Sequence, residues 1–442
     1  MMSGRPAVAG ATAAADAGAA AERFILGFGP EAGPPAGRRL TPPVGFPLPL
    51  ADLVDAAETD PARARRDFAA AFRASLGVRF ALAMDSGRAA LALALAALHR
   101  ARPDRDEVVL PAFTCFTLPA AAVRAGLRVR LVDLVPQSFA PDPDQLSAVA
   151  GPRTLAVVAP HLVGYPLDLT PLRHAAARVG AIVVDDAAQA LGARIAGLPA
   201  GAAGDLGILS FGRGKPLTAL GGGAVICDDP QIAAPIEDAA RALAAPPRGA
   251  ALRHAAAAAL YTPVLSPRLY WLPARLRFLK LGLTEYDPGF PLRPLDAFRT
   301  SLAVRGLERL ALVNEARRRT AERLTRALAD IPGLTLLPVP AAGHVIFLRF
   351  PILFPSPADR DRAHAALRAA GIGSSRLYPA PLTAIPHLAR HSPDAGRSFP
   401  VAAQLAGTLL CVPTYPHVGE REVAITAAIL RSVLATPETR GS

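Results

Sequence analysis

Short apolar runs alternate with longer stretches of helical spacing from Phe80 to Cys227. This alternation is typical of an α/β fold, in which helices cover both faces of a mostly parallel sheet. In such a sheet the carboxyl ends of the strands meet in a cleft that binds ligands. Functional side chains are therefore expected where the apolar runs end.

One such end follows the apolar run of AIVVDDAAQALGA and carries Asp185, Asp186 and Gln189. A lysine, Lys215, lies between two glycine clusters in GDLGILSFGRGKPLTALGGGAVICDD. Few neighbours in this loop can hold a solvated ammonium, so Lys215 is a candidate for an amine of lowered pKa that forms a Schiff base with a carbonyl cofactor. The alternative is a surface hairpin with an ordinary solvated lysine.

A strand-end carboxylate and a loop lysine together suit pyridoxal phosphate, because the carboxylate pairs with the protonated ring nitrogen and the lysine forms the imine. The motifs VVDDAAQA and SFGRGK, followed by a GGGA turn, resemble the DegT/StrS-type sugar aminotransferases, which are pyridoxal-phosphate enzymes of fold type I. The resemblance implies that Lys215 and Asp186 are the catalytic residues. The lysine separates this chain from the dehydratases of the family, which carry histidine there.

The resemblance runs from about Phe68 to Leu434 and implies an α/β architecture with two domains. The expected division is a disordered tail (1–23), a large cofactor-binding domain with an N-terminal arm (24–245), an insert (246–291) and a smaller C-terminal α+β domain (292–442). The large domain is expected to hold a mostly parallel sheet of the seven-stranded type between helices. Two helices are expected in the stretch that begins at Leu292 and leads into the small domain.

The resemblance also assigns the groups that hold the cofactor. The stretch MDSGRAAL resembles the SGTAAL motif that binds the cofactor phosphate, with arginine in place of threonine, although a simple helix N-cap explains the serine equally well. A serine at the end of the run before the lysine is expected to share the phosphate, and Gln189 to bond near the phenolic oxygen. The implied phosphate ligands are Ser86, Gly87, Arg88, Ala89 and Ser210.

Two further loops match family motifs with substitutions. In PAFTCFT the position that usually stacks an aromatic ring on the cofactor holds Cys115, followed by Phe116, so either side chain is a candidate for that contact and a place in the core is the alternative for both. SSRLYPAPL resembles the substrate loop HYPxPLH, so Arg376 and Tyr378 are expected to contact the substrate. His161 matches a family position and is expected to be a scaffold residue without a role in proton transfer.

The implied reaction is a transamination from an amino acid, expected to be glutamate, to a keto sugar that is expected to be nucleotide-linked, for amino-sugar and polysaccharide biosynthesis. A homodimer is expected from the family. One alternative is an aminotransferase for a lipid-linked or non-sugar ketone. Another is a non-catalytic regulatory or DNA-binding protein on the same fold.

The formal net charge of +12 raises the question of a nucleic-acid partner, but the arginines are scattered and no DNA- or RNA-binding motif accompanies them. No nucleic-acid partner is therefore expected, and an anionic nucleotide sugar fits the charge equally well. The three cysteines are widely spaced and predict neither a disulfide framework nor a metal site. The N-terminal stretch lacks the apolar core of a signal peptide, so a cytoplasmic protein is expected.

The insert 246–291 interleaves basic residues with apolar and aromatic ones, among them the single tryptophan, Trp271. Such a mixture is compatible with a helix that lies on an anionic membrane surface, and the substrate would then be a candidate for lipid linkage. A lid over the active site or a dimer-packing element is favoured instead, because no stretch of the insert is long or cleanly segregated.

Overall fold

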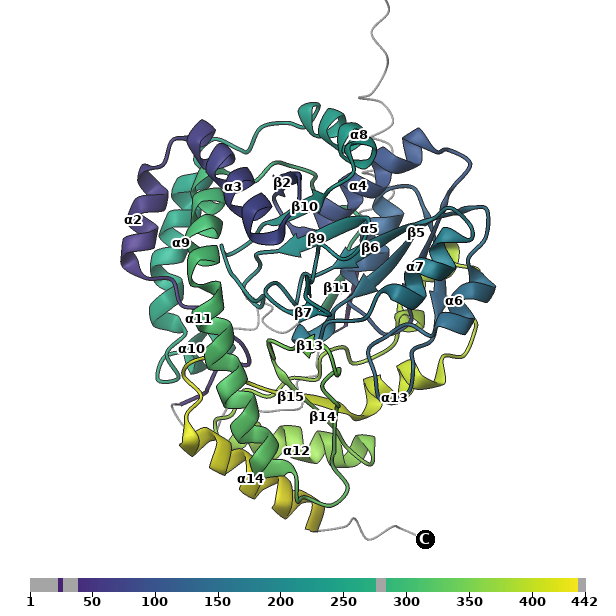
Figure 1. Ribbon diagram of the computed structural model, residues 1–442. Coiled ribbons are helices and arrows are strands. Elements are labelled where there is room, and N and C mark those ends of the chain that lie inside the picture. Colours follow the sequence, from purple (N-terminus) through teal and green to yellow (C-terminus); the bar gives the residue numbers. More distant parts are fainter. Residues whose placement is uncertain (1–22, 27–38, 276–283, 436–442) are drawn as a thin grey trace, which may run out of the picture.

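A seven-stranded sheet forms the centre of the molecule in the computed structural model, which describes residues 23–26, 39–275 and 284–435 (Figure 1). The strand order is β2-β10-β9-β6-β5-β3-β4. In that order the strands span Phe80–Met84, Gly223–Cys227, Leu206–Ser210, Ile182–Asp186, Thr154–Pro160, Glu107–Pro111 and Arg128–Val132. The predicted α/β architecture is confirmed.

The sheet is mostly parallel, and only β10 runs antiparallel to its two neighbours, β2 and β9. Every residue of β3, β5, β6 and β10 is buried, as continuous apolar strands in a sheet covered on both faces should be. Because β6 lies next to β9 in parallel register, the end of β6 with its two aspartates lies beside the start of the loop that carries Lys215.

Helices that connect the strands pack on the sheet and on one another. Helix α4 (Gly87–Ala101) packs on β10 and β9 and against α5 (Thr117–Arg124) and α8 (Pro230–Arg241). Helix α7 (Thr170–Ala177) packs on β6 and β5, beside α6 (Pro143–Val149). Alanine and leucine fill almost the whole buried surface of α4, which permits close approach to the sheet.

The expectation of two helices after Leu292 is wrong, because a single helix of 32 residues, α11, spans Ala297–Leu328. Asp296 caps its N-terminus by accepting a hydrogen bond from the Arg299 backbone N–H at 3.1 Å. Gly306 does not interrupt the helix. A β-carbon at that position would lie 2.8 Å from Leu217 Cγ, so the glycine permits close packing against the lysine loop.

Helix α11 runs from the helices α2 (Leu50–Glu58), α3 (Pro61–Leu76) and α9 (Ala250–Val264) down to the C-terminal part of the chain (Figure 1). There an antiparallel three-stranded sheet has the order β12-β14-β15, with strands Thr335–Leu336, Phe350–Leu353 and Leu409–Val412. Helices α12 (Pro357–Ala369) and α14 (Glu420–Ala435) accompany this sheet. A second small sheet joins β13 (Gly343–His344) to β7 (Arg194–Ile195) and β8 (Leu198–Pro199).

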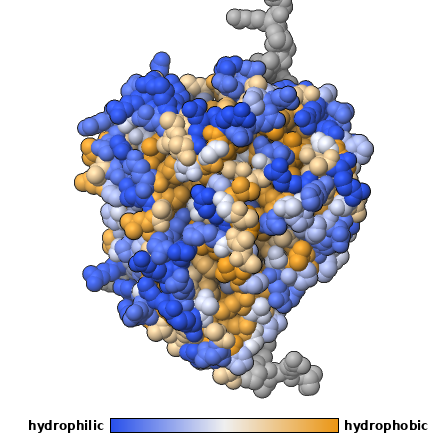
Figure 2. All heavy atoms as spheres, viewed as in Figure 1, coloured by the Kyte–Doolittle hydropathy of each residue, from blue (hydrophilic) through white to orange (hydrophobic). Residues whose placement is uncertain are grey.

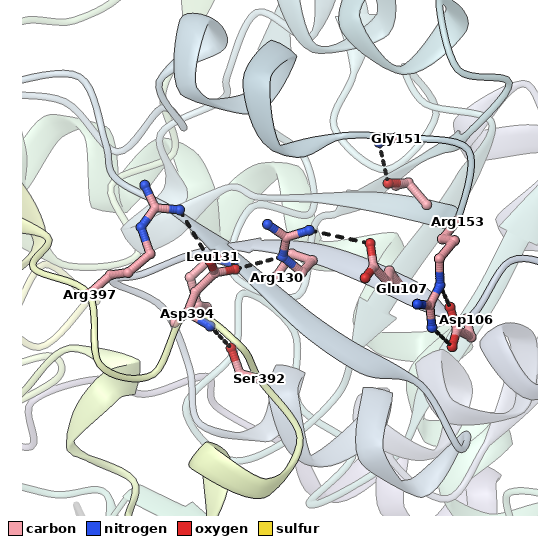
Figure 3. A network of polar contacts seen from close by, with 10 residues as sticks. Asp106, Glu107, Arg130, Leu131, Gly151, Arg153, Ser392, Asp394 and Arg397 are labelled. Carbon is pink, nitrogen blue, oxygen red and sulfur yellow. Dashed lines mark hydrogen bonds and ion pairs between the residues drawn. The ribbon is translucent and has the colours of Figure 1, made fainter.

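A network of ion pairs fastens the C-terminal part to the edge strand β4 (Figure 3). Arg130 donates from Nε to Asp394 Oδ2 at 2.8 Å, and Arg397 donates to the other oxygen of Asp394 at 3.1 Å. The Leu131 backbone N–H also bonds Asp394, at 3.1 Å. Burial opposes the charge of Asp394, but these hydrogen bonds hold the pKa of its carboxyl below the ordinary value.

The N-terminal arm contains one short strand, β1 (Phe24–Leu26), which pairs with β11 (Thr284–Tyr286). Farther along the arm, Thr41 forms a bridge to Ile372 in the C-terminal part. The expected tail at 1–23 lies almost entirely outside the described residues, and the domain boundaries at 245 and 291 stay predictions. Within the described ranges, no helix has both the length and the apolar character that a membrane span requires.

Candidate active site

Lys215 lies in the loop between β9 and β10, whose base is closed by a hydrogen bond from Phe211 N–H to the Gly222 carbonyl at 2.8 Å. Its side chain borders a cavity of about 620 Å³. In the described part of the chain, the ammonium has neither an ion-pair nor a hydrogen-bond partner. Burial lowers the pKa of Lys215, an effect that Cys115 and Asp186 oppose. Burial therefore makes it easier for this amine to lose its proton, as a nucleophilic lysine must.

A buried arginine on α11 holds the loop that carries Lys215 in place. Arg317 donates to the Pro216 carbonyl at 2.9 Å, to the Gly45 carbonyl at 3.2 Å and to Asn314 Oδ1 at 2.7 Å. Burial lowers the pKa of Arg317 to about 9. The sequence did not reveal this role, because RRRT offers three consecutive arginines and only the rotation of the helix selects one of them.

The two adjacent aspartates at the end of β6 have different surroundings, because successive side chains of a strand point to opposite faces. Asp185 binds His161 Nε2 at 2.6 Å and accepts a hydrogen bond from the Ala203 N–H at 2.9 Å. Since His161 Nδ1 accepts from the Leu167 N–H at 2.8 Å, its proton lies on Nε2 and is donated to Asp185. Both residues of this pair are part of the scaffold.

Asp186 faces the lysine side of the sheet. Its Oδ1 accepts a hydrogen bond from the Ala188 N–H at 3.0 Å. Burial raises the pKa of Asp186, while the Ala188 hydrogen bond and the charge of Lys215 lower it. A positive charge close to this carboxylate would favour its ionised form, which is the form that a protonated ring nitrogen requires.

Gln189 connects two segments beside the cavity. Its Nε2 donates to the Tyr378 hydroxyl at 2.7 Å, and its Oε1 accepts from the Val163 N–H at 3.2 Å. Val163 adopts a φ of 48°, a strained conformation for a β-branched residue. Burial raises the pKa of Tyr378, which therefore stays a neutral phenol. Cys115, Gln189, Lys215 and Tyr378 all line the cavity.

The predicted phosphate ligands lie where the N-terminus of α4 meets the end of β9. Ser86 caps the helix by accepting a hydrogen bond from the Ala89 N–H at 3.2 Å. A β-carbon on Gly87 would lie 3.0 Å from Ser210 Cβ, and one on Gly223 would lie 2.4 Å from the Gly87 nitrogen. The two glycines therefore allow the helix end and the strands to approach closely, beside free N–H groups that favour an anion.

The structure separates some of the predicted residues from the cavity. Ser86, Gly87, Arg88, Ala89, Asp186 and Ser210 are not among the side chains that line it. A β-carbon on Gly212 would nevertheless lie 3.6 Å from Lys215 Cγ and 3.8 Å from Ser210 Oγ, so Ser210, one of the predicted phosphate ligands, is close to the lysine.

Three predicted residues have other partners. The Arg88 guanidinium lies over the Phe290 ring, 4.8 Å from its centre. The Phe116 ring is fully buried and stacks with Phe24 at a centroid distance of 6.5 Å, so of the two neighbours Cys115 is the one that faces the cavity. Arg376 donates to Asp361 at 3.1 Å and lies outside the cavity lining.

The described part of the insert forms one wall of the cavity. This wall comes from α9 and from the segment that contains α10 (Trp271–Arg275), and most of its side chains are apolar. The insert thus borders the cavity beside Lys215, and its role as a lid stays a prediction. The lining residues of the insert are Ala257, Leu260, Tyr261, Val264, Leu265, Tyr270 and Pro273.

Residues 57–431 match the model of the DegT/DnrJ/EryC1/StrS aminotransferase family. A UDP-N-acetyl-3-dehydro-α-D-glucosamine 3-aminotransferase of Acidithiobacillus ferrooxidans is 31% identical, over 81% of this chain and 85% of that protein. A dTDP-3-amino-3,4,6-trideoxy-α-D-glucose transaminase of Streptomyces venezuelae is 30% identical, over 86% of this chain and 93% of that protein. The match covers both the large sheet and the C-terminal part.

Solved structures show the same fold. The structure of DesV of S. venezuelae superposes with a TM-score of 0.70 at 25% sequence identity, over 90% of this chain and all of that one. The central sheet, the long helix and the C-terminal sheet of this chain therefore form a fold-type-I aminotransferase.

The residues of the site fit pyridoxal phosphate. The half-buried amine of Lys215 has no partner among the described residues, and the buried carboxylate of Asp186 acts on it electrostatically. Gly87 and Gly223 leave no side chain between the helix N-terminus and Ser210, where a phosphate group would find N–H donors. The cavity beside Lys215 is large enough for a small ring and a substrate.

Proposed function

The chain belongs to the DegT/DnrJ/EryC1/StrS aminotransferase family and is a pyridoxal-phosphate-dependent aminotransferase, and we propose that it moves an amino group from glutamate to a nucleotide-linked keto sugar. The observation that carries the proposal is the half-buried Lys215 at the cavity, whose amine has no hydrogen-bond or ion-pair partner among the described residues and whose pKa is influenced by Asp186. The proposed biosynthetic role is the formation of an amino sugar.

The bound cofactor supplies an electron-accepting ring that stabilises negative charge at the carbon losing its proton. Lys215 Nζ would hold the cofactor covalently, and once the amine of the donor had displaced it, the freed amine would serve as the base that takes the proton from the donor Cα. Asp186 would accept a hydrogen bond from the ring nitrogen and so keep it protonated. Gln189, held by Val163 and Tyr378, bonds near the phenolic oxygen, and Cys115 offers a soft surface beside the ring.

The phosphate is assigned to the junction of α4 and β9. Ser86 and Ser210 offer hydroxyls there, and the first N–H groups of α4 offer backbone donors. Arg88, whose guanidinium lies over Phe290, is proposed to contribute through its backbone only. These hydroxyl and N–H groups would bind the negatively charged phosphate of the cofactor. The side of Lys215 that faces the cavity would then stay open to the substrates.

Two features support an anionic keto-sugar nucleotide as the acceptor. The relatives named above act on UDP- and dTDP-linked sugars. The cavity lining contains two arginines, Arg213 and Arg349, beside Lys215, and none of its residues is a carboxylate. The test is incubation with glutamate and a panel of UDP-, dTDP- and GDP-linked keto sugars, followed by mass spectrometry. Formation of an amino sugar is expected, and no product from any nucleotide would contradict the acceptor.

A second acceptor class is favoured by the apolar wall of the insert. Leu260, Val264, Leu265 and Pro273 face the cavity and would suit a lipid-linked or other apolar ketone better than a nucleotide. Competition between a nucleotide keto sugar and its lipid-linked analogue separates the two. Preferential use of the lipid-linked analogue would favour this second candidate. Sedimentation of the protein with vesicles of anionic lipid tests whether the insert contacts a membrane.

We also propose a homodimer in the reducing cytoplasm. Exposed leucines on three neighbouring helices support the assembly, and Figure 2 shows apolar patches on the viewed face, on which Figure 1 places α2 and α9. The free thiols of the described residues suit a reducing compartment. Light scattering during size-exclusion chromatography tests the dimer, and a single monomer peak would refute it. The leucines are Leu50, Leu252 and Leu312.

A further inference from the structure

The solvent-exposed face of α9 is unusual for a helix on a protein surface. After Arg253, its exposed positions are Ala256, Ala259, Leu260 and Pro263, none of which carries a polar side chain. A surface helix ordinarily turns charged or polar residues toward the water. The apolar face of α9 therefore indicates contact with a partner that is itself apolar.

The exposed apolar surface continues beyond α9. Leu260 is 71% exposed and also lines the cavity, so it lies at the cavity mouth. Farther along the chain, Leu269 and Leu272 are 42% and 47% exposed, and Trp271 lies between them in the sequence. Pro273 in α10 lines the cavity as well, so this segment borders the same mouth. The whole set, the mouth patch, consists of Leu260, Arg268, Leu269, Trp271, Leu272 and Arg275.

The charge of the insert complements an anionic partner. Residues 242–284 include six lysines and arginines and not one aspartate or glutamate, whereas the formal net charge of the whole chain is +12. In the mouth patch, Arg268 and Arg275 are exposed and form no ion pair with a described residue. The Arg275 guanidinium lies over the Trp271 ring, 4.8 Å from its centre. Positive charge and exposed apolar side chains thus occur together at the cavity mouth.

Three kinds of partner differ in how well they cover such a surface. A nucleic acid would meet the arginines but leave the exposed leucines in water. A second copy related by a two-fold axis would bring the same arginines face to face, because such an interface joins a patch to its own copy. The leucine that supports the proposed dimer, Leu252, lies at the other end of α9. An anionic bilayer offers phosphates to the arginines and acyl chains to the leucines, and tryptophan favours the boundary between the two.

We propose that the mouth patch docks on the surface of an anionic phospholipid membrane. Its leucines enter the acyl boundary, and its arginines stay at the level of the phosphates. The cavity beside Lys215 then opens at the lipid–water boundary, since Leu260 belongs both to the patch and to the cavity wall. The inference goes beyond the proposed function, because docking requires neither donor nor acceptor.

The fold produces a segregation that the sequence of the insert lacks. Basic, apolar and aromatic residues alternate along the chain without a clear helical period. In the structure, Tyr261 and Leu265 line the cavity, whereas Leu269 and Leu272 are exposed together with the arginines of the patch. An interfacial surface therefore arises from the end of one helix and the segment after it, without a long amphipathic helix.

The single tryptophan of the chain allows a direct test, since its fluorescence reports on the mouth patch alone. The cofactor-loaded full chain is mixed with vesicles of phosphatidylcholine, or of phosphatidylcholine and phosphatidylglycerol in equal parts. Only the mixed vesicles are expected to shift the emission to shorter wavelength, and lipid brominated on its acyl chains is expected to quench it. High salt is expected to weaken both effects, because it screens the arginines. An emission spectrum that the mixed vesicles leave unchanged would overturn the proposal, as would equal binding to both kinds of vesicle.

Two charge variants test the contribution of the arginines. Sedimentation with the mixed vesicles measures the apparent Kd, which is expected to rise about 30-fold in the double variant Arg268→Gln/Arg275→Gln. The matched control is Arg100→Gln/Arg178→Gln, which removes two exposed charges from α4 and from the end of α7, both of which lie away from α9 (Figure 1). The control is expected to bind like the wild type. Equal weakening in the two double variants would show that net charge, and not the patch, attracts the vesicles.

A leucine variant separates insertion from charge attraction. Leu269→Gln/Leu272→Gln keeps both arginines of the patch and is expected to raise the apparent Kd at least about tenfold. Neither leucine lines the cavity, so the variant is expected to keep the wild-type Tm and cofactor absorbance, which shows that it folds. Wild-type binding of this variant to the mixed vesicles refutes the insertion of the patch.

The rival partners give different results. A protein that ignores the vesicles, and whose dimer is lost in Leu269→Gln/Leu272→Gln by light scattering, would use the patch to contact a second copy. Binding of double-stranded DNA in place of vesicles would indicate a nucleic acid. Either result overturns the proposal. Because no substrate is present in these experiments, failure of the proposed donor or acceptor is recognised separately from failure of docking.

Discussion

At the scale of single residues, two neighbouring carboxylates perform different tasks because a strand presents them to opposite faces. Asp185 is occupied by His161 and the Ala203 N–H, whereas Asp186 interacts electrostatically with Lys215. The ionised form of Asp186 is what the cofactor ring needs, and the approach of a positive charge favours it against the effect of burial.

Asp186→Asn is therefore expected to keep the cofactor bound and to lower kcat by at least about 100-fold, since an amide cannot hold the ring nitrogen protonated. Stopped-flow kinetics of the half-reaction with glutamate measures this. Asp185→Asn serves as the control. It is expected to lower the thermal stability of the protein and to change kcat of the cofactor-loaded enzyme only slightly. Equal loss of rate in the two variants would contradict the different roles.

At the scale of secondary-structure elements, α11 is attached to the lysine loop through Gly306 and Arg317, and it also packs against α14 in the C-terminal part. A Gly→Ala change within a helix ordinarily stabilises by about 0.5–1 kcal/mol. Here the added methyl group would lie 2.8 Å from Leu217 Cγ, so the overpacking cost of about 1–3 kcal/mol outweighs that gain.

Gly306→Ala is thus expected to lower Tm and to weaken cofactor binding, because the displaced Leu217 lies two residues after Lys215. The measurement is thermal unfolding together with titration of the cofactor. In the double variant with Leu217→Ala the methyl group has room, and a positive coupling between the two changes is expected. Additive effects would show that the contact does not matter.

The ion pairs of Asp394 at the edge strand β4 should make the stability of the protein depend on pH. The pKa of Asp394 is lower in the folded state than in the unfolded chain, so its stabilising effect is complete above about pH 4 and is lost as the pH falls through the folded pKa. The Tm difference between wild type and Asp394→Asn is expected to be largest near neutral pH and to shrink below about pH 4. A difference that is constant from pH 7 to pH 3 would contradict this assignment.

At the scale of the whole molecule, the sequence predicted those features that depend on continuous apolar runs and local motifs. The strands around Asp186 and Lys215 are of this kind, because each run is buried on both faces of the sheet. The sequence did not predict the buried position of Arg317, since only the tertiary packing decides which of many arginines is buried. The unbroken α11 was also missed, because the packing that tolerates Gly306 lies in a distant loop.

The central claim is that Lys215 forms the covalent link to the cofactor. The chain contains only two lysines, Lys215 and Lys280, the second of which lies outside the described residues, so chemical trapping is unambiguous. Borohydride reduction of the purified yellow protein, followed by peptide mass spectrometry, is expected to place the reduced cofactor on Lys215, and Lys215→Ala is expected to lose both the label and the bleaching by glutamate. A label on Lys280, or a Lys215→Ala protein that still bleaches with glutamate, would contradict the account.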